Sequence, residues 1–298
     1  MSQPLVSIAV CTFNGAKYLA EQLDSIINQT YKNLEVIIID DQSSDQTVDI
    51  LRTYLEKHSN FHIYENDANI GYIKNFEKAI CLCNGEYIAL ADQDDVWVLN
   101  KIELQLQFIQ DHIMVYHDSE FMDEVGNPLN RKMSDLRNFY SGNDPRHFLL
   151  ENCVSGHSVM FKRELIPYLL PFPIELFHDW WIAFVATNHG YINFQKDLLV
   201  KYRQHSNTST DMLQQKKTNY KKRSDRLTEL IKKVKIFYQY PSDKHHKFIA
   251  KLLELLEKNI SHSNYALSVF VWKHRSILLF IQKKNTWSKF NFCRKLRA

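Results

Sequence analysis

The first hundred residues alternate between two hydrophobic periodicities, and no other feature of the sequence restricts the fold as strongly. Four short apolar segments predict buried strands, at Leu5–Cys11, Leu34–Ile39, Phe61–Tyr64 and Tyr87–Ala91. Between them, apolar residues recur at helical spacing, as at Leu19, Leu23 and Ile26. Strands that alternate with helices in this way predict an α/β domain with a mostly parallel central sheet and right-handed crossovers.

Polar clusters follow three of these strands. They are Thr12-Phe13-Asn14-Gly15, Asp40-Asp41 and Asp92-Gln93-Asp94-Asp95. The carboxyl ends of parallel strands meet at one edge of a sheet, where the ligands of α/β proteins bind. We therefore expect these clusters to line one binding site.

The acidic run from Asp92 to Asp95 indicates a divalent cation. Three carboxylates within four residues repel one another, and a bound cation removes that cost. Oxygen ligands suit Mg²⁺ or Mn²⁺, which bind one or two carboxylates together with substrate phosphates. The alternative is a solvated acidic turn that caps the helix after Trp97. The position at the end of a buried strand favours the metal.

The segment from Asp40 to Asp45 allows two interpretations. A carboxylate at a strand end could accept hydrogen bonds from a nucleobase, whereas Ser44 or Asp45 could instead cap the next helix. Gly15 is the only glycine of the first polar cluster, and the spacing Gly-x-Gly-x-x-Gly is absent from the chain. These observations exclude a Walker phosphate loop and a dinucleotide-binding fingerprint.

Two further polar residues stand in unusual surroundings. Asp179 lies between a histidine and two tryptophans, and partial desolvation there would raise its pKa and suit a general base. The alternative is an aromatic core in which Asp179 caps a helix. His205 ends the run Tyr202-Arg203-Gln204-His205, and as one of 13 histidines it would ordinarily be structural or exposed.

The chain changes character after about residue 210. Residues 1–210 contain 16 Lys and Arg against 28 Asp and Glu, whereas residues 211–298 contain 21 against 6. Apolar spacing predicts three helices in the basic part, at Lys216–Tyr238, Lys244–Ser261 and Tyr265–Ile281. Between Met114 and Arg203 it predicts only short strands and loops. We therefore divide the chain into an α/β domain at 1–210 and a basic helical region at 211–298.

The basic region suggests an anionic partner. No nucleic-acid-binding motif is present, so we expect no nucleic acid. Residues 264–292 are rich in aromatic and aliphatic side chains, but Lys273-His274-Arg275 interrupts them before they could span a bilayer. The segment would lie in the interface of an anionic membrane. The alternatives are packing in a helical bundle and a homodimer interface.

The sequence also suggests a compartment. The five cysteines are odd in number, and the N-terminus has neither a basic start nor a long apolar stretch. Both features predict a cytoplasmic protein with reduced thiols. Membrane contact through the basic region would place it at the inner face of the cell membrane.

Several motifs, taken in order, resemble family 2 of the glycosyltransferases, which have the GT-A fold. They are Val6–Asn14, Gln29-Thr30-Tyr31, Glu35–Asp45, Asn69-Ile70-Gly71, and Asp92-Gln93-Asp94-Asp95 with Trp97. The resemblance covers about residues 4–210 and is more specific than any single motif. The Asp-Gln-Asp-Asp-Val-Trp, His-Asp-Trp-Trp and Tyr-Arg-Gln-His runs look most like the bacterial rhamnosyltransferase-like branch.

The resemblance implies a role for particular residues. The implied nucleotide-binding residues are Thr12, Asn14, Asp41, Lys74 and Asp92. The implied metal ligands are Asp92, Asp94 and His205. Lys74 stands where many relatives carry arginine, which is a departure from the family pattern. Asp179 is the implied catalytic base, and the segment 152–157 is implied to shape the acceptor side.

The function implied is that of an inverting, metal-dependent glycosyltransferase. It would move a sugar from dTDP-rhamnose or a UDP-hexose to a glycan or lipid-linked oligosaccharide acceptor in bacterial surface polysaccharide synthesis. The ion, Mn²⁺ or Mg²⁺, would stabilise the charge of the leaving diphosphate. The alternatives are a sugar nucleotidyltransferase and a basic nucleic-acid-binding module with a structural α/β domain.

Overall fold

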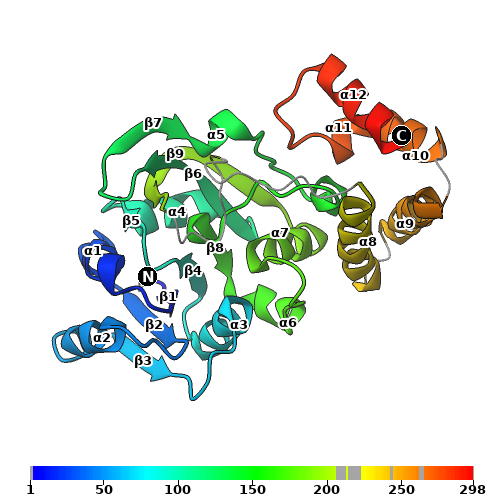
Figure 1. Ribbon diagram of the computed structural model, residues 1–298. Helices are drawn as coiled ribbons and strands as arrows, with labels where there is room; N and C mark the ends of the chain where they lie inside the picture. Colours follow the sequence, from blue (N-terminus) through cyan, green and yellow to red (C-terminus); the bar gives the residue numbers. More distant parts are fainter. Residues whose placement is uncertain (1–2, 206–212, 214–222, 242–243, 262–264, 298) are drawn as a thin grey trace.

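The computed structural model describes residues 3–205, 213, 223–241, 244–261 and 265–297, and its strands form one twisted sheet (Figure 1). In these residues the strand order is β3-β2-β1-β4-β8-β6-β9-β5, with β7 paired to β6. From β4 to β5 in this order, no two neighbouring strands are consecutive in the sequence. Segments that are far apart in the sequence therefore meet in the middle of the sheet.

The N-terminal half of the sheet is parallel, as predicted. Its strands are β1 (Val6–Thr12), β2 (Leu34–Asp40), β3 (Phe61–Glu65) and β4 (Tyr87–Ala91). The helices between them are α1 (Ala16–Ile27), α2 (Thr47–Leu55) and α3 (Tyr72–Leu82). Every residue of β1 and β2 is buried, because helices cover both faces of a parallel sheet.

The second half of the sheet is mixed. Its strands are β5 (Val96–Trp97), β6 (Met114–Met122), β7 (Pro128–Lys132), β8 (Val159–Lys162) and β9 (Ile192–Arg203). Strand β8 is antiparallel to both β4 and β6, β5 is antiparallel to β9, and β6 is parallel to β9. The prediction of only short strands here was wrong, because β6 and β9 have 9 and 12 residues. Buried polar residues in β6, His117, Asp118 and Ser119, conceal its strand pattern.

Short helices fill the connections of this half. They are α4 (Lys101–Ile109), α5 (Met133–Leu136), the 3₁₀ turns η1 (Pro145–Phe148), η2 (Gly156–Ser158) and η3 (Arg163–Leu165), α6 (Ile166–Leu169) and α7 (His178–His189). Helix α7 is buried on nearly all sides, since it lies between the sheet and the C-terminal helices. Its N-terminus brings His178 and Asp179 to the site described below.

The C-terminal region is helical, as predicted. It contains α8 (Arg223–Gln239), α9 (His246–Ser261), α10 (Tyr265–Lys273), α11 (Arg275–Leu278) and α12 (Thr286–Arg297). The expected start at Lys216 and the expected boundary at 210/211 lie outside the described residues. The single helix expected over Tyr265–Ile281 is interrupted at His274, and the chain then leaves helical geometry where Asn138 N–H bonds the carbonyl of Ile281 at 2.9 Å.

The C-terminal helices share a hydrophobic core with the sheet. Phe237 of α8 packs against Trp180 and Phe184 of α7, with ring centroids 6.2 and 4.4 Å apart. Leu267, Val271 and Leu279 are buried in the same cluster. Much of the apolar content of this region therefore packs inside the protein. Within the described residues, no helix is both long and apolar enough to cross a bilayer.

Candidate active site

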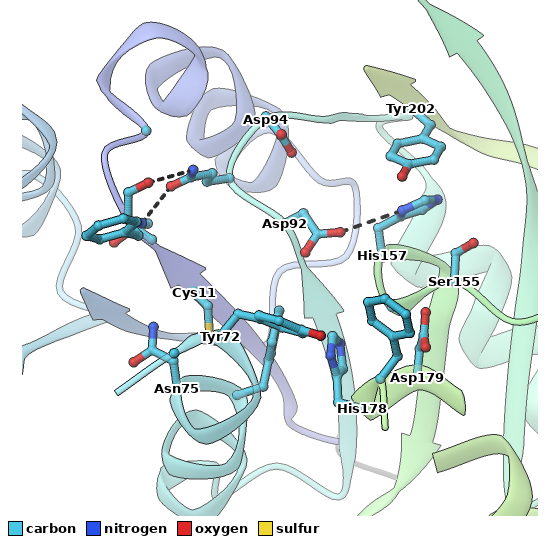
Figure 2. A pocket seen from close by; sticks show the side chains of 18 of the residues that line it. Cys11, Tyr72, Asn75, Asp92, Asp94, Ser155, His157, His178, Asp179 and Tyr202 are labelled. Atoms are coloured by element: carbon cyan, nitrogen blue, oxygen red, sulfur yellow. Dashed lines mark hydrogen bonds and ion pairs between the residues drawn. The ribbon is translucent and has the colours of Figure 1, made fainter. Parts of the chain in front are cut away.

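A cavity of about 830 Å³ opens along the carboxyl ends of β1 and β4 and reaches the N-terminus of α7 (Figure 2). Of the residues implicated by sequence, it is lined by Thr12, Asn14, Asp41, Asp92, Asp94, Asp179 and His205. These side chains come from segments as far apart as β1 and the end of β9. The polar clusters at the strand ends thus come together along one cavity.

One wall of the cavity is built from the loops after β1 and β2. The Thr12 hydroxyl donates to Asp40 Oδ1 at 2.8 Å, and Asn14 Oδ1 accepts from the Ser44 N–H at 2.8 Å. Asp45 accepts from the N–H groups of Ala16 and Thr47, the first residues of α1 and α2. Asp45 thus supports the starts of both helices, but the capping interpretation was wrong, because the N-cap residue of α2 is Gln46.

The Asp41 carboxylate organises a neighbouring loop. It accepts hydrogen bonds from the N–H groups of Ile70 and Gly71, both at 2.8 Å, and from the Asn66 amide at 2.9 Å. Gly71 has a φ of +82°, a conformation that favours glycine. Asp41 therefore holds the loop after β3 in place while its side chain lines the cavity.

Lys74 lies apart from the other implicated residues. It is not among the residues that line the cavity, and its ammonium pairs with Glu77 one helical turn later at 2.9 Å. The nucleotide-binding role that the resemblance implies for Lys74 stays a prediction.

Asp94 and His205 meet at the rim of the cavity. Antiparallel pairing of β5 with β9 brings the two segments together, and His205 Nε2 lies 2.8 Å from Asp94 Oδ2. The buried Arg203 fastens this junction, because its N–H donates to Asp95 Oδ1 at 3.0 Å and its Nε donates to the Asp94 carbonyl at 2.8 Å. The Asp94 carboxylate and the His205 imidazole are therefore already in contact without a bound ligand.

Asp92 faces a different histidine, His157 of η2. His157 Nδ1 lies 3.8 Å from Asp92 Oδ2 and 3.4 Å from Asp95 Oδ2, and its Nε2 is 2.9 Å from the Ser119 hydroxyl. Burial opposes charge on Asp92, yet the His157 ring outweighs it and keeps the pKa of Asp92 below its usual value. Burial and the charges of Asp94 and Asp92 raise the pKa of Asp95.

These residues fit a divalent cation. A carboxylate oxygen and an imidazole nitrogen are both suitable ligand atoms, and Asp94 Oδ2 and His205 Nε2 already lie side by side through a hydrogen bond of 2.8 Å, which a bound ion would replace. Asp92, Asp95 and His157 form a second group whose ligand atoms lie within 4.8 Å of one another. Among the described residues, the buried Oδ2 of Asp95 has no hydrogen-bond partner, so this oxygen could serve as a ligand.

Asp179 faces the cavity from the first turn of α7. Its Oδ1 accepts a hydrogen bond from the Asn152 amide at 3.2 Å. Burial, reinforced by the charge of Asp92, raises the pKa of Asp179 to about 7. The predicted desolvation is confirmed, and its neighbour Trp180 is buried with its indole N–H bonded to the carbonyl of Phe148 at 2.6 Å.

The sequence profile described as Glycosyl transferase family 2 matches residues 7–169, which include β1 to β4, Asp92, Asp94 and His157. The chain belongs to this family. An uncharacterized glycosyltransferase of Rickettsia typhi is 31% identical over 71% of this chain and 69% of its own length. The putative teichuronic acid biosynthesis glycosyltransferase TuaG of Bacillus subtilis is 31% identical over 43% of this chain and 52% of its own length.

Solved structures show the same GT-A fold as this family 2 chain. The structure of S. aureus TarS 1–349 in complex with UDP-GlcNAc covers 92% of this chain and 73% of its own, with a TM-score of 0.62 at 19% identity. The mannosyltransferase PcManGT of Pyrobaculum calidifontis, in complex with GDP-Man and Mn²⁺, covers 93% and 76%, with a TM-score of 0.57 at 19% identity. The predicted fold class is thereby confirmed.

The site of this glycosyltransferase contains contacts that the sequence did not indicate. The resemblance placed His157 in a segment on the acceptor side, but it did not indicate that His157 lies beside Asp92. His157 is beside Asp92 because β8, which follows it, pairs antiparallel with β4. Tyr72 and His178 line the cavity from α3 and α7. The two ring systems meet edge to face with centroids 6.0 Å apart. The sequence indicated this part of the cavity wall only through the aromatic residues around Asp179.

Proposed function

We propose that the chain is an inverting, metal-dependent glycosyltransferase that uses a nucleotide-diphosphate sugar. The observation that carries the proposal is one cavity with two chemically different ends. Asp94 and His205 form a pair suited to a divalent ion at one end, and a carboxyl group with a pKa of about 7 faces the same space from α7. In the proposed reaction an acceptor hydroxyl attacks the sugar while the diphosphate leaves from the opposite face. The hydroxyl needs a base, and the leaving diphosphate needs a cation.

Asp92, Asp94 and His205 would hold the Mn²⁺ or Mg²⁺. When bound, the ion would stabilise the negative charge that develops on the leaving diphosphate. The chain's own contribution at this end is preorganisation, since Arg203 fixes the Asp94–Asp95 turn before any ligand arrives. The loop held by Asp41 would bound the nucleotide, with Thr12 and Asn14 beside it.

Asp179 would take the proton of the acceptor hydroxyl as that hydroxyl attacks the anomeric carbon. A carboxyl group with a pKa near 7 is a stronger base than an ordinary aspartate and is still largely ionised slightly above neutral pH. The Asn152 amide orients it. A single displacement of this kind inverts the anomeric carbon.

The donor would be dTDP-rhamnose or a UDP-hexose, and the acceptor a glycan or lipid-linked oligosaccharide of a bacterial surface polysaccharide. The resemblance of the His-Asp-Trp-Trp run to the rhamnosyltransferase-like branch supports the first donor. The UDP-GlcNAc complex of TarS supports the second. The relative TuaG, whose description names teichuronic acid biosynthesis, supports the polysaccharide setting. Family membership favours transfer over the nucleotidyltransferase and nucleic-acid alternatives.

A thermal-shift panel tests the proposal. The folded chain with Mn²⁺ is heated with UDP, dTDP, GDP, UDP-GlcNAc, UDP-glucose, dTDP-rhamnose and GDP-mannose. A ligand at about 100 times its Kd should raise the melting temperature by about 5 °C, and EDTA should abolish the rise. No shift with any of these compounds would contradict the proposed function.

The pH dependence of turnover tests the base. Asp179 acts as a base only when ionised, so kcat should rise with pH through about 7 and level off about one unit higher. Because the Asn152 amide stabilises the charged form, Asn152→Ala should move the midpoint to higher pH. The measurement is kcat at saturating donor from pH 5.5 to 9. A flat profile between pH 5.5 and 8 would contradict the assignment.

We further propose peripheral contact with an anionic membrane, in a cytoplasmic location. Trp287 and Phe290 of α12 are 70% and 41% exposed and stack at 5.7 Å, and Trp272 of α10 meets Phe290 edge to face at 5.4 Å. The Arg275 guanidinium lies over Trp272 at 4.4 Å. An exposed aromatic cluster beside cationic side chains suits a negatively charged interface.

Vesicle flotation tests this contact. Deleting α10 to α12 would remove buried core residues, so point variants are the cleaner probe. Wild type should float with vesicles of phosphatidylglycerol at low salt, and Trp287→Ser with Phe290→Ser should not. Tyr168→Ser, an exposed aromatic of α6, is the control. Equal flotation of all variants would contradict membrane contact, and concentration-dependent dimerisation lost in the double variant would assign the cluster to a homodimer.

A further inference from the structure

His178, next to Asp179 in the first turn of α7, lines the cavity without a polar partner. The residue is 6% exposed, and within the described part of the chain neither of its ring nitrogens has a hydrogen-bond partner. A buried polar group without a partner destabilises the folded chain. A ligand that supplied the missing hydrogen bonds would offset this destabilisation.

The ring is held firmly by its neighbours. It stacks on Phe76 of α3 with centroids 4.3 Å apart and an interplanar angle of 24°, and it meets Tyr72 edge to face. On the other side stands Gly156, where an added Cβ would lie only 2.8 Å from His178 Nε2. Apolar packing thus fixes the plane of the imidazole. Both ring nitrogens are buried in the cavity wall, and among the described residues they have no partner, so a hydroxyl group would reach them by displacing a neighbour in the wall.

We propose that His178 determines sugar specificity by hydrogen-bonding a hydroxyl group of the pyranose that is transferred. The proposal rests on the proposed function. A neutral imidazole has one N–H donor and one nitrogen acceptor, and a hydroxyl group both donates and accepts. Diphosphate oxygens only accept and would favour a charged partner. Burial lowers the pKa of His178 to about 4, which keeps the ring neutral near pH 7.

The position of the ring assigns it to the transferred sugar. Its neighbour Asp179 faces the same cavity, and the charge of Asp92 is close enough to act on the imidazole. Figure 2 shows His178 below Asp92 and beside Tyr72, with Asp179, the next residue of α7, to its right. An anomeric carbon between the base and the leaving diphosphate would put the sugar ring in this part of the cavity.

The test measures, by calorimetry with Mn²⁺, how much each variant loses in affinity for two ligands. The first ligand is the free nucleotide that wild type binds best among UDP, dTDP and GDP. The second is the nucleotide sugar of that same nucleotide that wild type binds best among UDP-GlcNAc, UDP-glucose, dTDP-rhamnose and GDP-mannose. His178→Phe keeps an aromatic ring against Phe76 but has no nitrogen. His178→Gln keeps a donor and an acceptor. His62→Phe, exposed on β3 outside the cavity, is the control.

We expect His178→Phe to weaken binding of the nucleotide sugar at least 10-fold more than binding of the free nucleotide. His178→Gln should restore part of the difference, and His62→Phe should show none. Equal losses for both ligands in His178→Phe, or equal losses in the Phe and Gln variants with lowered melting temperatures, would overturn the proposal. If wild type binds no nucleotide at all, the proposed function fails and this inference fails with it.

Discussion

Asp179→Asn is expected to lower turnover about 10²- to 10⁴-fold, the range that general base catalysis contributes. Asparagine keeps the shape of the side chain but does not accept the proton of the acceptor hydroxyl. Nucleotide-sugar affinity should change little, because the carboxylate would act on the acceptor hydroxyl in the transition state. The first measurement is kcat at saturating donor, with a cell extract that contains the glycan or lipid-linked acceptor. The second is the affinity for the donor, measured by calorimetry.

Glu175→Gln is the matched control for this variant. Glu175 lies four residues before Asp179, is exposed and does not line the cavity, so the same loss of a carboxylate there should leave kcat within about twofold. Near-normal turnover of Asp179→Asn would remove Asp179 from the role of base. A fall in its melting temperature together with lost donor binding would instead show a structural role.

Asp94→Asn is expected to lower transfer about 10³-fold and to weaken Mn²⁺ binding. The substitution removes a negative ligand atom that lies 2.8 Å from His205 Nε2, and Lewis-acid stabilisation of a leaving group is worth several kcal/mol. His205→Ala should have a similar effect, because both residues would contact one ion. The measurements are Mn²⁺ titration by calorimetry with the nucleotide present, and kcat as a function of Mn²⁺.

A second pair of variants decides which carboxylates hold the ion. If the ion sits among Asp92, Asp95 and His157, His157→Gln should weaken Mn²⁺ binding while Asp94→Asn leaves it intact. Asp111→Asn, an exposed aspartate outside the cavity, is the control for the change of charge. Full activity of Asp94→Asn in the presence of EDTA would contradict metal dependence itself.

Residues at the ends of the parallel strands could be located from the sequence. Thr12, Asn14, Asp41 and Asp92 follow buried apolar segments, and parallel pairing of β1, β2 and β4 brings their carboxyl ends to one edge. The desolvated setting of Asp179 could be expected too, since its aromatic neighbours were adjacent in the chain. Both inferences depend only on residues that are near one another in the sequence and on the hydrophobic pattern around them.

Residues that depend on non-local pairing could not be located in this way. His157 approaches Asp92 only because β8 runs antiparallel to β4. The sequence did not predict this pairing, because buried polar residues in β6, the other neighbour of β8, conceal the strand pattern of that region. The place of Lys74 in a motif implied contact with the nucleotide, and the motif did not indicate that its ammonium pairs with Glu77 on α3.

Hydrophobic periodicity reports local structure and burial, and it was sufficient to predict the α/β class, the parallel half of the sheet and the polar edge of the cavity. The family resemblance implied that Asp94 and His205 share an ion, but their contact comes from the β5–β9 pairing of segments more than a hundred residues apart, which periodicity does not show. The packing of the basic helices against α7 through their apolar side chains was likewise established by the tertiary structure. The choice among partners for an apolar face depends on the shape of the whole chain, which periodicity does not contain.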